Sequence, residues 1–578
     1  MLNEKKSLLD LESEDARKFF LEKNSYFSQG LPSYYDIEYL LNHAKENLEK
    51  NELNNKNHLV IDNIYSKYPE INYILHVNKT MESYRPLTLI HPFLYVDLVN
   101  FITSEKNWKK VKERYDELHQ KISDKIICSS IPYILDENKD ERHALNFWQQ
   151  VEQTSIVLSL KYNYLLHTDI SNYYSSIYTH TLPWAFHGEE EAKQNKTNKS
   201  LIGNVLDKKF QYMNYGETVG LPQGNAVSDL MAEMLLKYID SLLVERLENI
   251  NKTLEYKILR YRDDYRIFTE SKENEDLIKK ELLILLQRHK LTLSEAKTKS
   301  STDLIKHSLK EDKLFWIEHD PVIKIGMDKI YTLPKKKLDK KEFEKLYYNR
   351  IYKATIQKHL YIIKLFSEKY PNSGQLIGAF KEFEERIKDL SRSELEKSGT
   401  DISVLIAIIT DLIRKNPKVT ESGLKILSVL FEKIDTYSIF DKIFKLYIYS
   451  PTDKKKYETG DQRKFELVSN IIKKISSKST NSYLEIWLQR LIIKNLDSES
   501  MLINEYKKNC NEKLVNLCND IIEKNETSVV IFNEDWIKEK YRIDWNKFIN
   551  RQKINQLTNI IKSEEIFVNE YSLLSKID

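Results

Sequence analysis

The sequence predicts an α+β region followed by an all-α region, and three observations support this expectation. Over roughly the first 335 residues, short runs rich in β-branched, aromatic and leucine residues alternate with amphipathic segments. From about residue 345 onward, apolar residues recur at helical spacing almost without interruption. Only 12 of the 578 residues are glycine, against an average usage of about 7%, and this scarcity favours long helices over turn-rich sheets.

Three segments of the α+β region are expected to form strands. Residues 164–170, 256–261 and 265–269 are short and rich in β-branched, aromatic or leucine residues. Only a few residues separate the last two segments, which predicts that they form a hairpin.

The all-α region shows paired helical patterns. One helix is predicted by Leu405, Ile406, Ile409, Leu412 and Ile413, and Asn416-Pro417 ends it. A similar arrangement follows in the apolar positions Leu424, Leu427, Phe431 and Ile434, then Phe465, Val468, Ile472 and Ile475, then Leu484, Trp487, Leu488 and Leu491. Antiparallel helix pairs stacked in an array are one interpretation. An ordinary irregular helical domain is the other, because no repeat has a fixed period.

Composition indicates a globular rather than a disordered chain. A chain of 578 residues corresponds to two or three domains. Apolar residues make up 41% and charged residues 31%, with a formal net charge of +3, which is typical of a soluble globular protein. A nucleic-acid partner would therefore need a local basic surface rather than bulk charge.

Cysteine usage and hydropathy suggest the cellular location. Cys128, Cys510 and Cys518 are too few and too scattered for a disulfide framework or a four-ligand zinc site. Neither a signal peptide nor an apolar run of transmembrane length is visible. We expect a cytoplasmic protein with no membrane partner.

The sequence Tyr261-Arg262-Asp263-Asp264 places two acids side by side. Consecutive residues of a strand point to opposite faces, so both acids can serve one site only if the chain turns there. We therefore expect a hairpin with its tip at Asp263-Asp264. Two unit charges about 4 Å apart repel by roughly 4 kcal/mol at an effective dielectric constant near 20, and divalent cations would offset this repulsion. The alternative is a polar turn without function.

A third acid, Asp169, ends the predicted strand 164–170 and precedes helix-capping residues. A site for two divalent metal ions needs oxygen ligands from separate strands. Asp169 and Asp263 meet this requirement if their strands are neighbours. The alternative for Asp169 is a helix N-cap.

Between these acids lies the loop Gly220-Leu221-Pro222-Gln223-Gly224. A glycine-flanked loop that leads into a helix allows the backbone to approach a ligand closely. The simpler interpretation is a tight turn before a helix. The predicted helix has an apolar stripe formed by Val227, Leu230, Met231, Met234, Leu235, Tyr238, Ile239 and Leu242.

In this order, Asp169, the Leu-Pro-Gln-Gly loop, Tyr-Arg-Asp-Asp and residues 291–298 resemble the four palm motifs of reverse transcriptases, lettered A to D. Asn78-Lys79 followed by Tyr84-Arg85 is similar to their fingers segment. The resemblance covers roughly residues 60–330. It implies right-hand fingers with an N-terminal helical region over residues 1–150 and a palm over 151–335, and residues 336–578 would form the helical-repeat domain.

The resemblance also implies a role for each matching residue. Asp169 and Asp263 would bridge two Mg²⁺ or Mn²⁺ ions, Asp264 would support them, and Ile170 would offer its backbone carbonyl. The other implied roles are triphosphate binding by Lys79 and Arg85, exclusion of ribonucleotides by Tyr174, contact with the nucleotide sugar and template base by Gln223, protonation of pyrophosphate by Lys297, and a primer-proximal position for Tyr261 and Arg262. Surface lysine and core tyrosine remain the alternatives for Lys297 and Tyr174, and Lys290 and Lys299 lie close to Lys297 in the sequence.

Within this family, residues 177–185 and the long helical tail are most similar to the bacterial abortive-infection and unknown-group defence enzymes of the AbiK and Abi-P2 kind. This likeness implies a metal-dependent DNA polymerase that uses dNTPs and a DNA or RNA strand, acts in antiphage defence, and is protein-primed or template-independent. It also implies homo-oligomers built through the helical domain, and a non-coding RNA is a further candidate partner.

Two alternatives remain open. One is a conventional RNA-templated reverse transcriptase of a retron or intron, although the Val-Thr-Gly signature of retron enzymes is absent and no cysteine or histidine cluster indicates an appended nuclease. The other is an inactive polymerase fold that acts as a nucleic-acid-binding scaffold. Two departures from the family concern the primer. Arg262 stands where a small or apolar residue is common. No clear strand-turn-strand primer grip follows Lys297, and residues 315–317 are the best candidate for one.

Overall fold

The computed structural model describes residues 6–49, 68–79, 83–134, 145–309, 311–323, 352, 354–388, 390–397, 401–433, 471, 474–475, 482–495, 510, 512–523, 527–537 and 539–559. Its strands are β1 (Lys6–Ser7), β2 (Tyr73–Asn78), β3 (Tyr84–Leu89), β4 (Ile126–Cys128), β5 (Tyr133–Ile134), β6 (Tyr164–Asp169), β7 (Tyr256–Tyr261), β8 (Asp264–Thr269) and β9 (Lys299–Ser301). The helices before the sheet hairpin are α1 (Ser13–Phe20), α2 (Lys23–Tyr26), α3 (Ile37–Glu49), α5 (Pro92–Ile102), α6 (Glu105–Ile122), α7 (Leu145–Leu158), α8 (Tyr173–Ser176), α9 (Thr181–His187), α10 (Glu189–Gln194), α11 (Ile202–Met213) and α12 (Ala226–Ile250).

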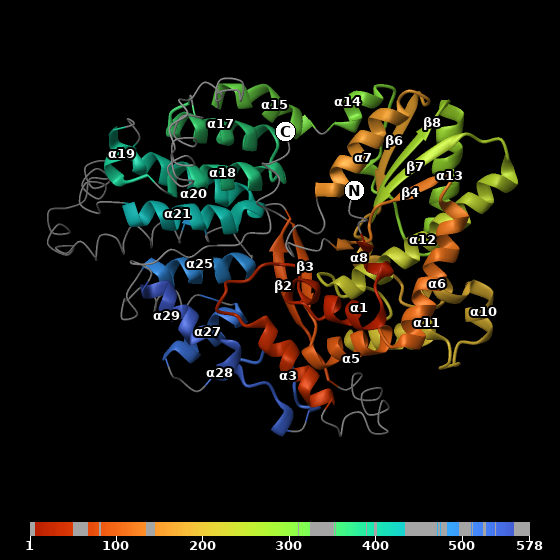
Figure 1. Cartoon of the computed structure of the whole chain (residues 1–578), viewed down its shortest axis with the longest axis horizontal. Helices are drawn as coiled ribbons and strands as arrows, with labels where there is room; N and C mark the ends of the chain where they lie inside the picture. Colours follow the sequence, from red (N-terminus) through yellow and green to blue (C-terminus); the bar gives the residue numbers. More distant parts are fainter. Residues whose placement is uncertain are drawn as a thin grey trace, which may run out of the picture.

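The helices after the hairpin form most of the remaining described chain. They are α13 (Lys272–Arg288), α14 (Leu304–Ser308), α15 (Glu311–Ile323), α17 (Ile356–Lys369), α18 (Gln375–Lys388), α19 (Arg392–Lys397), α20 (Ile402–Lys415), α21 (Thr420–Lys433), α25 (Ser482–Asn495), α27 (Lys513–Glu523), α28 (Trp545–Phe548) and α29 (Arg551–Asn559). Short 3₁₀ helices include η2 (Glu295–Lys297) and η4 (Pro417–Val419). Figure 1 shows the helices from α17 onward on one side of the β2–β3 hairpin and the main sheet on the other.

The main sheet has five strands in the order β4-β7-β8-β6-β9. The three predicted strands are confirmed as β6, β7 and β8, and β6 ends at Asp169. The predicted position of the hairpin tip is wrong by one residue. Tyr261 pairs with Asp264 in the ladder, so the two-residue loop is Arg262-Asp263. Arg262 has a φ of 51°, and a positive φ at the first loop residue is the geometry that joins twisted strands through a two-residue turn.

The two faces of this sheet have different environments. Ile258, Tyr265 and Ile267 point into the main core, where α12 and α13 cover the sheet. On the opposite face Leu165, Leu259 and Phe268 form a smaller apolar cluster with Val151 and Leu304 from α7 and α14. Because side chains alternate along a strand, this second face also carries Asp169 and Asp264, which pair directly across the ladder.

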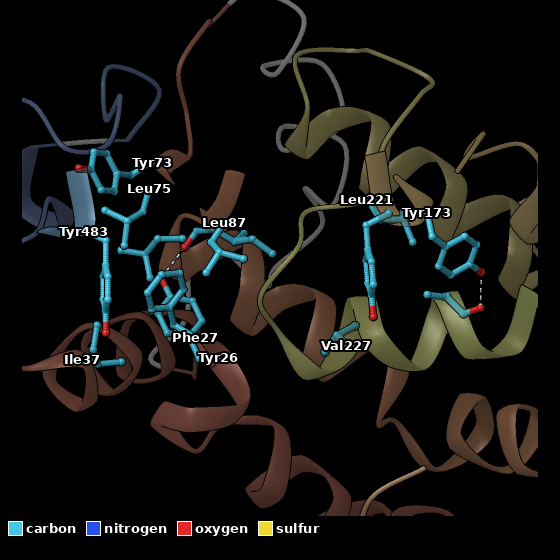
Figure 2. Close-up of a cluster of buried hydrophobic side chains, with 14 of the residues drawn as sticks. Tyr26, Phe27, Ile37, Tyr73, Leu75, Leu87, Tyr173, Leu221, Val227 and Tyr483 are labelled. Atoms are coloured by element: carbon cyan, nitrogen blue, oxygen red, sulfur yellow. Dashed lines mark hydrogen bonds between the residues drawn. The ribbon is translucent and has the colours of Figure 1, made fainter. Parts of the chain in front are cut away.

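The β2–β3 hairpin connects the sheet region to the helical region. Thr88 in β3 donates its N–H to the carbonyl of Gln223 at 2.8 Å, so the hairpin rests on the loop before α12. Gly224 in that loop has a φ of 107°, and a Cβ there would lie 3.5 Å from Leu87 of the hairpin. On the other side, Tyr483 of α25 lies beside Leu75 of β2, as Figure 2 shows.

The predicted helices of the all-α region are confirmed where the structure describes them. Leu405 to Ile413 lie on α20, and η4 begins at Pro417 and leads into α21. These two helices pack so closely that a Cβ on Gly423 would lie 2.4 Å from Ile413 Cγ1. Leu484 to Leu491 lie on α25. A regular repeat stays a prediction, because Ile434, Phe465, Val468 and Ile472 lie outside the described residues.

The prediction of a primer grip at residues 315–317 is wrong, because these residues lie in the middle of α15. Phe315 stacks on His319 one turn later, with ring centroids 3.8 Å apart. Phe315 and Trp316 also pack on Phe366 of α17. The aromatic residues therefore anchor the first helix after the sheet region to the helical region.

The end of the described chain returns to its beginning. Ile549 forms a β-bridge with Tyr35, and Asp36 donates its N–H to the carbonyl of Phe548 at 2.8 Å. In the described part of the chain, no helix has an apolar stretch long enough to cross a membrane.

Candidate active site

The three predicted acids lie at one end of the main sheet. Asp169 is the last residue of β6 and pairs with Asp264, the first residue of β8. Asp263 occupies the turn beside them, and its carbonyl accepts the N–H of Ile170 at 3.1 Å. The hairpin and the end of β6 are therefore joined by backbone hydrogen bonds at the point where the acids meet.

Asp169 and Asp263 form a pair of like charges. Burial raises the pKa of Asp263, and the nearby charge of Asp169 raises this pKa further. Lys297, at the end of η2, donates to Asp169 Oδ2 at 2.8 Å. The lysine is half-exposed, whereas the side chain of Asp169 is mostly buried. Of the lysines considered from the sequence, Lys297 is thus the one with an ion pair to this site among the described residues.

Asp264 has a different partner. Its Oδ1 lies 2.9 Å from His167 Nε2, and His167 is two residues before Asp169 on the same face of β6. With Asp264 turned toward His167, no group of three or more histidine, cysteine or acidic side chains converges on one point within the described ranges.

The donor set at the end of the sheet nevertheless suits hard cations. One carboxylate at the end of β6 and one in the turn between β7 and β8 offer oxygen ligands, which Mg²⁺ and Mn²⁺ prefer. Asp263 is held beside Asp169 in a half-buried position where its negative charge is poorly compensated, as the raised pKa indicates. Ile170, predicted to contribute a carbonyl, is fully buried and adjoins both acids.

A buried ionic network supports the hairpin from behind. Arg260 is fully buried and donates to Glu233 at 2.7 and 2.9 Å and to Asp240 at 2.7 Å, both on α12. Arg260 also donates to the carbonyl of Arg262 at 3.1 Å. Tyr265 donates its hydroxyl to the other oxygen of Asp240 at 2.9 Å. Strands β7 and β8 are therefore both fixed to α12 directly behind the turn.

Arg262 does not extend freely from the turn. Its guanidinium donates to Asp229 Oδ2 on α12 at 2.8 Å. The hydroxyl of Tyr174 donates to the other oxygen of Asp229 at 2.5 Å. Tyr174 is buried, and this burial raises the pKa of its hydroxyl. The arginine predicted to lie near the primer and the tyrosine predicted to contact the sugar are thus connected through one carboxylate. Tyr261, also predicted near the primer, ends β7 with its ring 5.7 Å from the Arg262 guanidinium.

The predicted nucleotide-binding residues lie on connected elements. Leu221 donates its N–H to the carbonyl of Tyr174 at 2.9 Å, and Gln223 accepts from Thr88 of β3. Arg85 lies on β3, and Lys79 follows β2 with its N–H bonded to the carbonyl of Ser83 at 2.8 Å. Backbone hydrogen bonds therefore link the β2–β3 hairpin to the loop at Gln223 and that loop to Tyr174.

Sequence reasoning missed His167, Asp229 and the Arg260 network. His167 could have been found, because it lies two residues before Asp169 and must share its face. Asp229 could have been suspected as the partner of an arginine in an unusual position. The Glu233 and Asp240 contacts join segments that are distant in sequence, and no local pattern predicts them.

Comparison with known proteins identifies the segment that carries this geometry. Residues 78–346 match the family model described as "Reverse transcriptase (RNA-dependent DNA polymerase)". This segment contains β3, the Gln223 loop and all five strands of the main sheet, together with the three acids. These residues therefore have a reverse-transcriptase-like fold. No curated protein matches the sequence.

Solved telomerase structures are loosely similar to the chain. Apo telomerase from Candida tropicalis is 13% identical with a TM-score of 0.28, and the match covers 76% of this chain and 68% of that one. Telomerase from Candida albicans in complex with a fragment of telomeric RNA is 11% identical with a TM-score of 0.25, covering 77% and 65% of the two chains. The Candida tropicalis enzyme with such a fragment gives 14% identity and a TM-score of 0.27, covering 76% and 63%.

Proposed function

We propose that this chain is a metal-dependent DNA polymerase of the reverse-transcriptase type, which transfers deoxynucleotides to a primer. The observation that carries the proposal is the position of Asp169 and Asp263 at the end of the sheet, with backbone hydrogen bonds joining the two segments. A reverse-transcriptase domain over residues 78–346 supports it.

Asp169 and Asp263 would hold the metal ions, with the carbonyl of Ile170 as a further ligand and Asp264 as a supporting acid. Two Mg²⁺ or Mn²⁺ ions bound there supply activation of the primer hydroxyl and neutralise charge on the departing pyrophosphate. Lys297, which donates to Asp169, would give a proton to pyrophosphate. Lys79 and Arg85 would bind the triphosphate, and Gln223 and Tyr174 would contact the sugar.

The test is incorporation of labelled dNTPs by purified protein with Mg²⁺ or Mn²⁺, with and without added template and primer. Asp263→Asn removes a charge without changing shape, so synthesis should fall by at least a hundredfold while thermal stability is retained. Glu273→Gln, on the exposed surface of α13, is the matched control and should keep full activity. Full activity of Asp263→Asn would show that the hairpin is not the metal site.

The same assay separates the alternatives. Product that stays attached to protein after nuclease treatment indicates protein priming, and synthesis without template indicates template independence. Synthesis that requires an RNA template and a free primer indicates a conventional reverse transcriptase. A wild-type protein that binds nucleic acid but incorporates no nucleotide is an inactive scaffold.

A role in antiphage defence is proposed from the sequence resemblance of residues 177–185 to the abortive-infection branch. Cells that express the wild-type chain should then resist phage, and cells that express Asp263→Asn should not. Size-exclusion chromatography with light scattering tests the proposed homo-oligomer, and sequencing of co-purified nucleic acid tests for a bound non-coding RNA.

A further inference from the structure

Asn372, in the turn between α17 and α18, makes one of the contacts between the helical region and the β2–β3 hairpin. Its side-chain amide donates to the carbonyl of Lys79, at the end of β2. Its side-chain oxygen accepts the N–H of Lys418 in η4 at 2.9 Å. The backbones of Lys79 and Lys418 are therefore bonded to the same side chain, although 339 positions separate them in the sequence.

Asn372 is itself held firmly in this position. It has a φ of 56°, a left-handed conformation that asparagine tolerates better than most residues. Its N–H donates to the side-chain oxygen of Asn416 at 2.8 Å, and Asn416 is buried between α20 and η4. The junction between the hairpin and η4 is thus a defined structure rather than a chance approach of two surfaces.

Three cationic side chains gather at this junction. Arg85 pairs with Val77 across the β2–β3 ladder, and Lys79 follows Val77 by two residues, so both cations extend from the same face of the hairpin. Lys418 approaches them from η4. None of the three has an ion pair within 4 Å to another described residue.

The lowered pKa of Lys418 indicates that the three positive charges repel one another. Partial burial lowers the pKa of Lys418, and the positive charges of Arg85 and Lys79 lower it further. Asp312 at the start of α15 acts in the opposite direction, but its Oδ2 already accepts the hydroxyl of Ser373 at 2.6 Å. Three cations against one carboxylate leave a local excess of positive charge.

We propose that Lys418 of the helical region joins Lys79 and Arg85 in one binding site for the triphosphate of the incoming nucleotide. This inference rests on the proposed polymerase function and extends it, because it assigns part of the nucleotide site to residues beyond the matched domain. A triphosphate carries several negative charges in a compact group, and three cations on two rigid elements fit such a group.

The position of the hairpin favours a nucleotide over a nucleic-acid strand. Thr88, three residues after Arg85 on β3, is hydrogen bonded to Gln223, the residue expected beside the nucleotide sugar. Three residues of strand span about 10 Å, which is the distance scale between a nucleotide's sugar and its terminal phosphate.

The test compares four proteins as full chains: wild type, Lys418→Ala, Lys418→Arg and Lys358→Ala. Because Asn372 bonds the backbone of Lys418, a change in the side chain of Lys418 leaves this hydrogen bond intact. Lys358, an exposed lysine on α17, is the matched control. The measurements are KM and kcat for dATP, direct binding of a fluorescent dATP analogue by anisotropy, and binding of a labelled oligonucleotide at several salt concentrations.

Lys418→Ala should weaken analogue binding and raise the KM for dATP by roughly tenfold, with kcat changed less than about twofold. Lys418→Arg, which keeps the positive charge, should restore most of the analogue binding lost in Lys418→Ala. Lys358→Ala should behave as the wild type. Unchanged analogue binding in Lys418→Ala would overturn the inference. So would a loss of oligonucleotide affinity with a lower salt slope and an unchanged KM, because the cluster would then bind a nucleic-acid backbone.

Failure of the proposed function has a different outcome. If the wild-type chain incorporates no nucleotide, the polymerase assignment falls, yet the anisotropy measurement still decides whether Lys418 contributes to triphosphate binding. If the wild-type chain does not bind the dATP analogue either, both proposals are wrong.

Discussion

Arg262 donates a hydrogen bond to Asp229 at 2.8 Å, and this ion pair ties the turn of the hairpin to the first turns of α12. An arginine at the second position of Tyr-x-Asp-Asp would otherwise be free to contact primer phosphates. Its partner carboxylate instead fixes it beside Tyr174, which uses the other oxygen of Asp229.

A double-mutant cycle tests whether Arg262 and Asp229 act as one unit. We expect Arg262→Met and Asp229→Ala each to lower kcat/KM roughly tenfold, because either change releases the turn from α12. The double variant should be no worse than either single variant. Losses that multiply to about a hundredfold would show that the two residues act independently.

Tyr174 offers a test that separates its ring from its hydroxyl. Tyr174→Phe removes the hydrogen bond to Asp229 and keeps the ring, so stability should fall by about 1 kcal/mol while the preference for dATP over ATP is kept. Tyr174→Ala should lower that preference by roughly tenfold or more. The measurement is the ratio of kcat/KM for the two nucleotides. An unchanged ratio in the alanine variant would assign Tyr174 to the core alone.

The buried Arg260 network predicts a large effect on stability. Arg260→Met would leave Glu233 and Asp240 buried without their cation, which should cost about 3–5 kcal/mol. Arg542→Met is the control, since Arg542 is a half-exposed arginine paired with the exposed Asp535, and it should cost less than about 1 kcal/mol. Thermal melts measure both. Adding Glu233→Gln and Asp240→Asn to Arg260→Met should recover part of the loss.

Glu512 predicts a pH dependence of stability in the helical region. Burial raises the pKa of Glu512 to about 7, whereas a glutamate in an unfolded chain titrates near pH ~4.3. Below that lower pH the residue is protonated in both states. As the pH rises toward 7, Glu512 ionises readily only in the unfolded state, so the folded state loses stability. This loss is complete above the pKa of Glu512 in the folded state.

Glu512→Gln should remove this loss, which is on the order of 3 kcal/mol. The melting temperature of the variant relative to wild type should therefore increase between pH 5 and pH 8. Glu539→Gln, at an exposed position, is the control and should show no such trend. A difference in melting temperature between Glu512→Gln and the wild type that does not change with pH would contradict the raised pKa of Glu512.

The sequence predicted the sheet strands well because their residue types and lengths are distinctive. Residues 256–261 form β7 at the predicted bounds. The sequence predicts the turn one residue too late, because an arginine rarely adopts a positive φ and the residue type therefore gives no sign of the turn at Arg262. The aromatic run at residues 315–317 favours a strand, but packing on α17 overrides that local preference.

The sequence predicts only those site residues that their neighbours along the chain make recognisable. Asp169 and Asp263 are each recognisable from neighbouring residues, and the sheet brings them together. The pairs Asp264 with His167 and Arg262 with Asp229 depend on which side chains face one another after folding. Lys418 is even harder to predict from the sequence, since it lies near Lys79 only because both backbones are bonded to Asn372.

The β-bridge between Tyr35 and Ile549 has a consequence for biosynthesis. The segment around Tyr35 finds part of its packing surface in residues that the ribosome adds long after it. The packing around Tyr35 therefore cannot be completed until translation has passed Ile549.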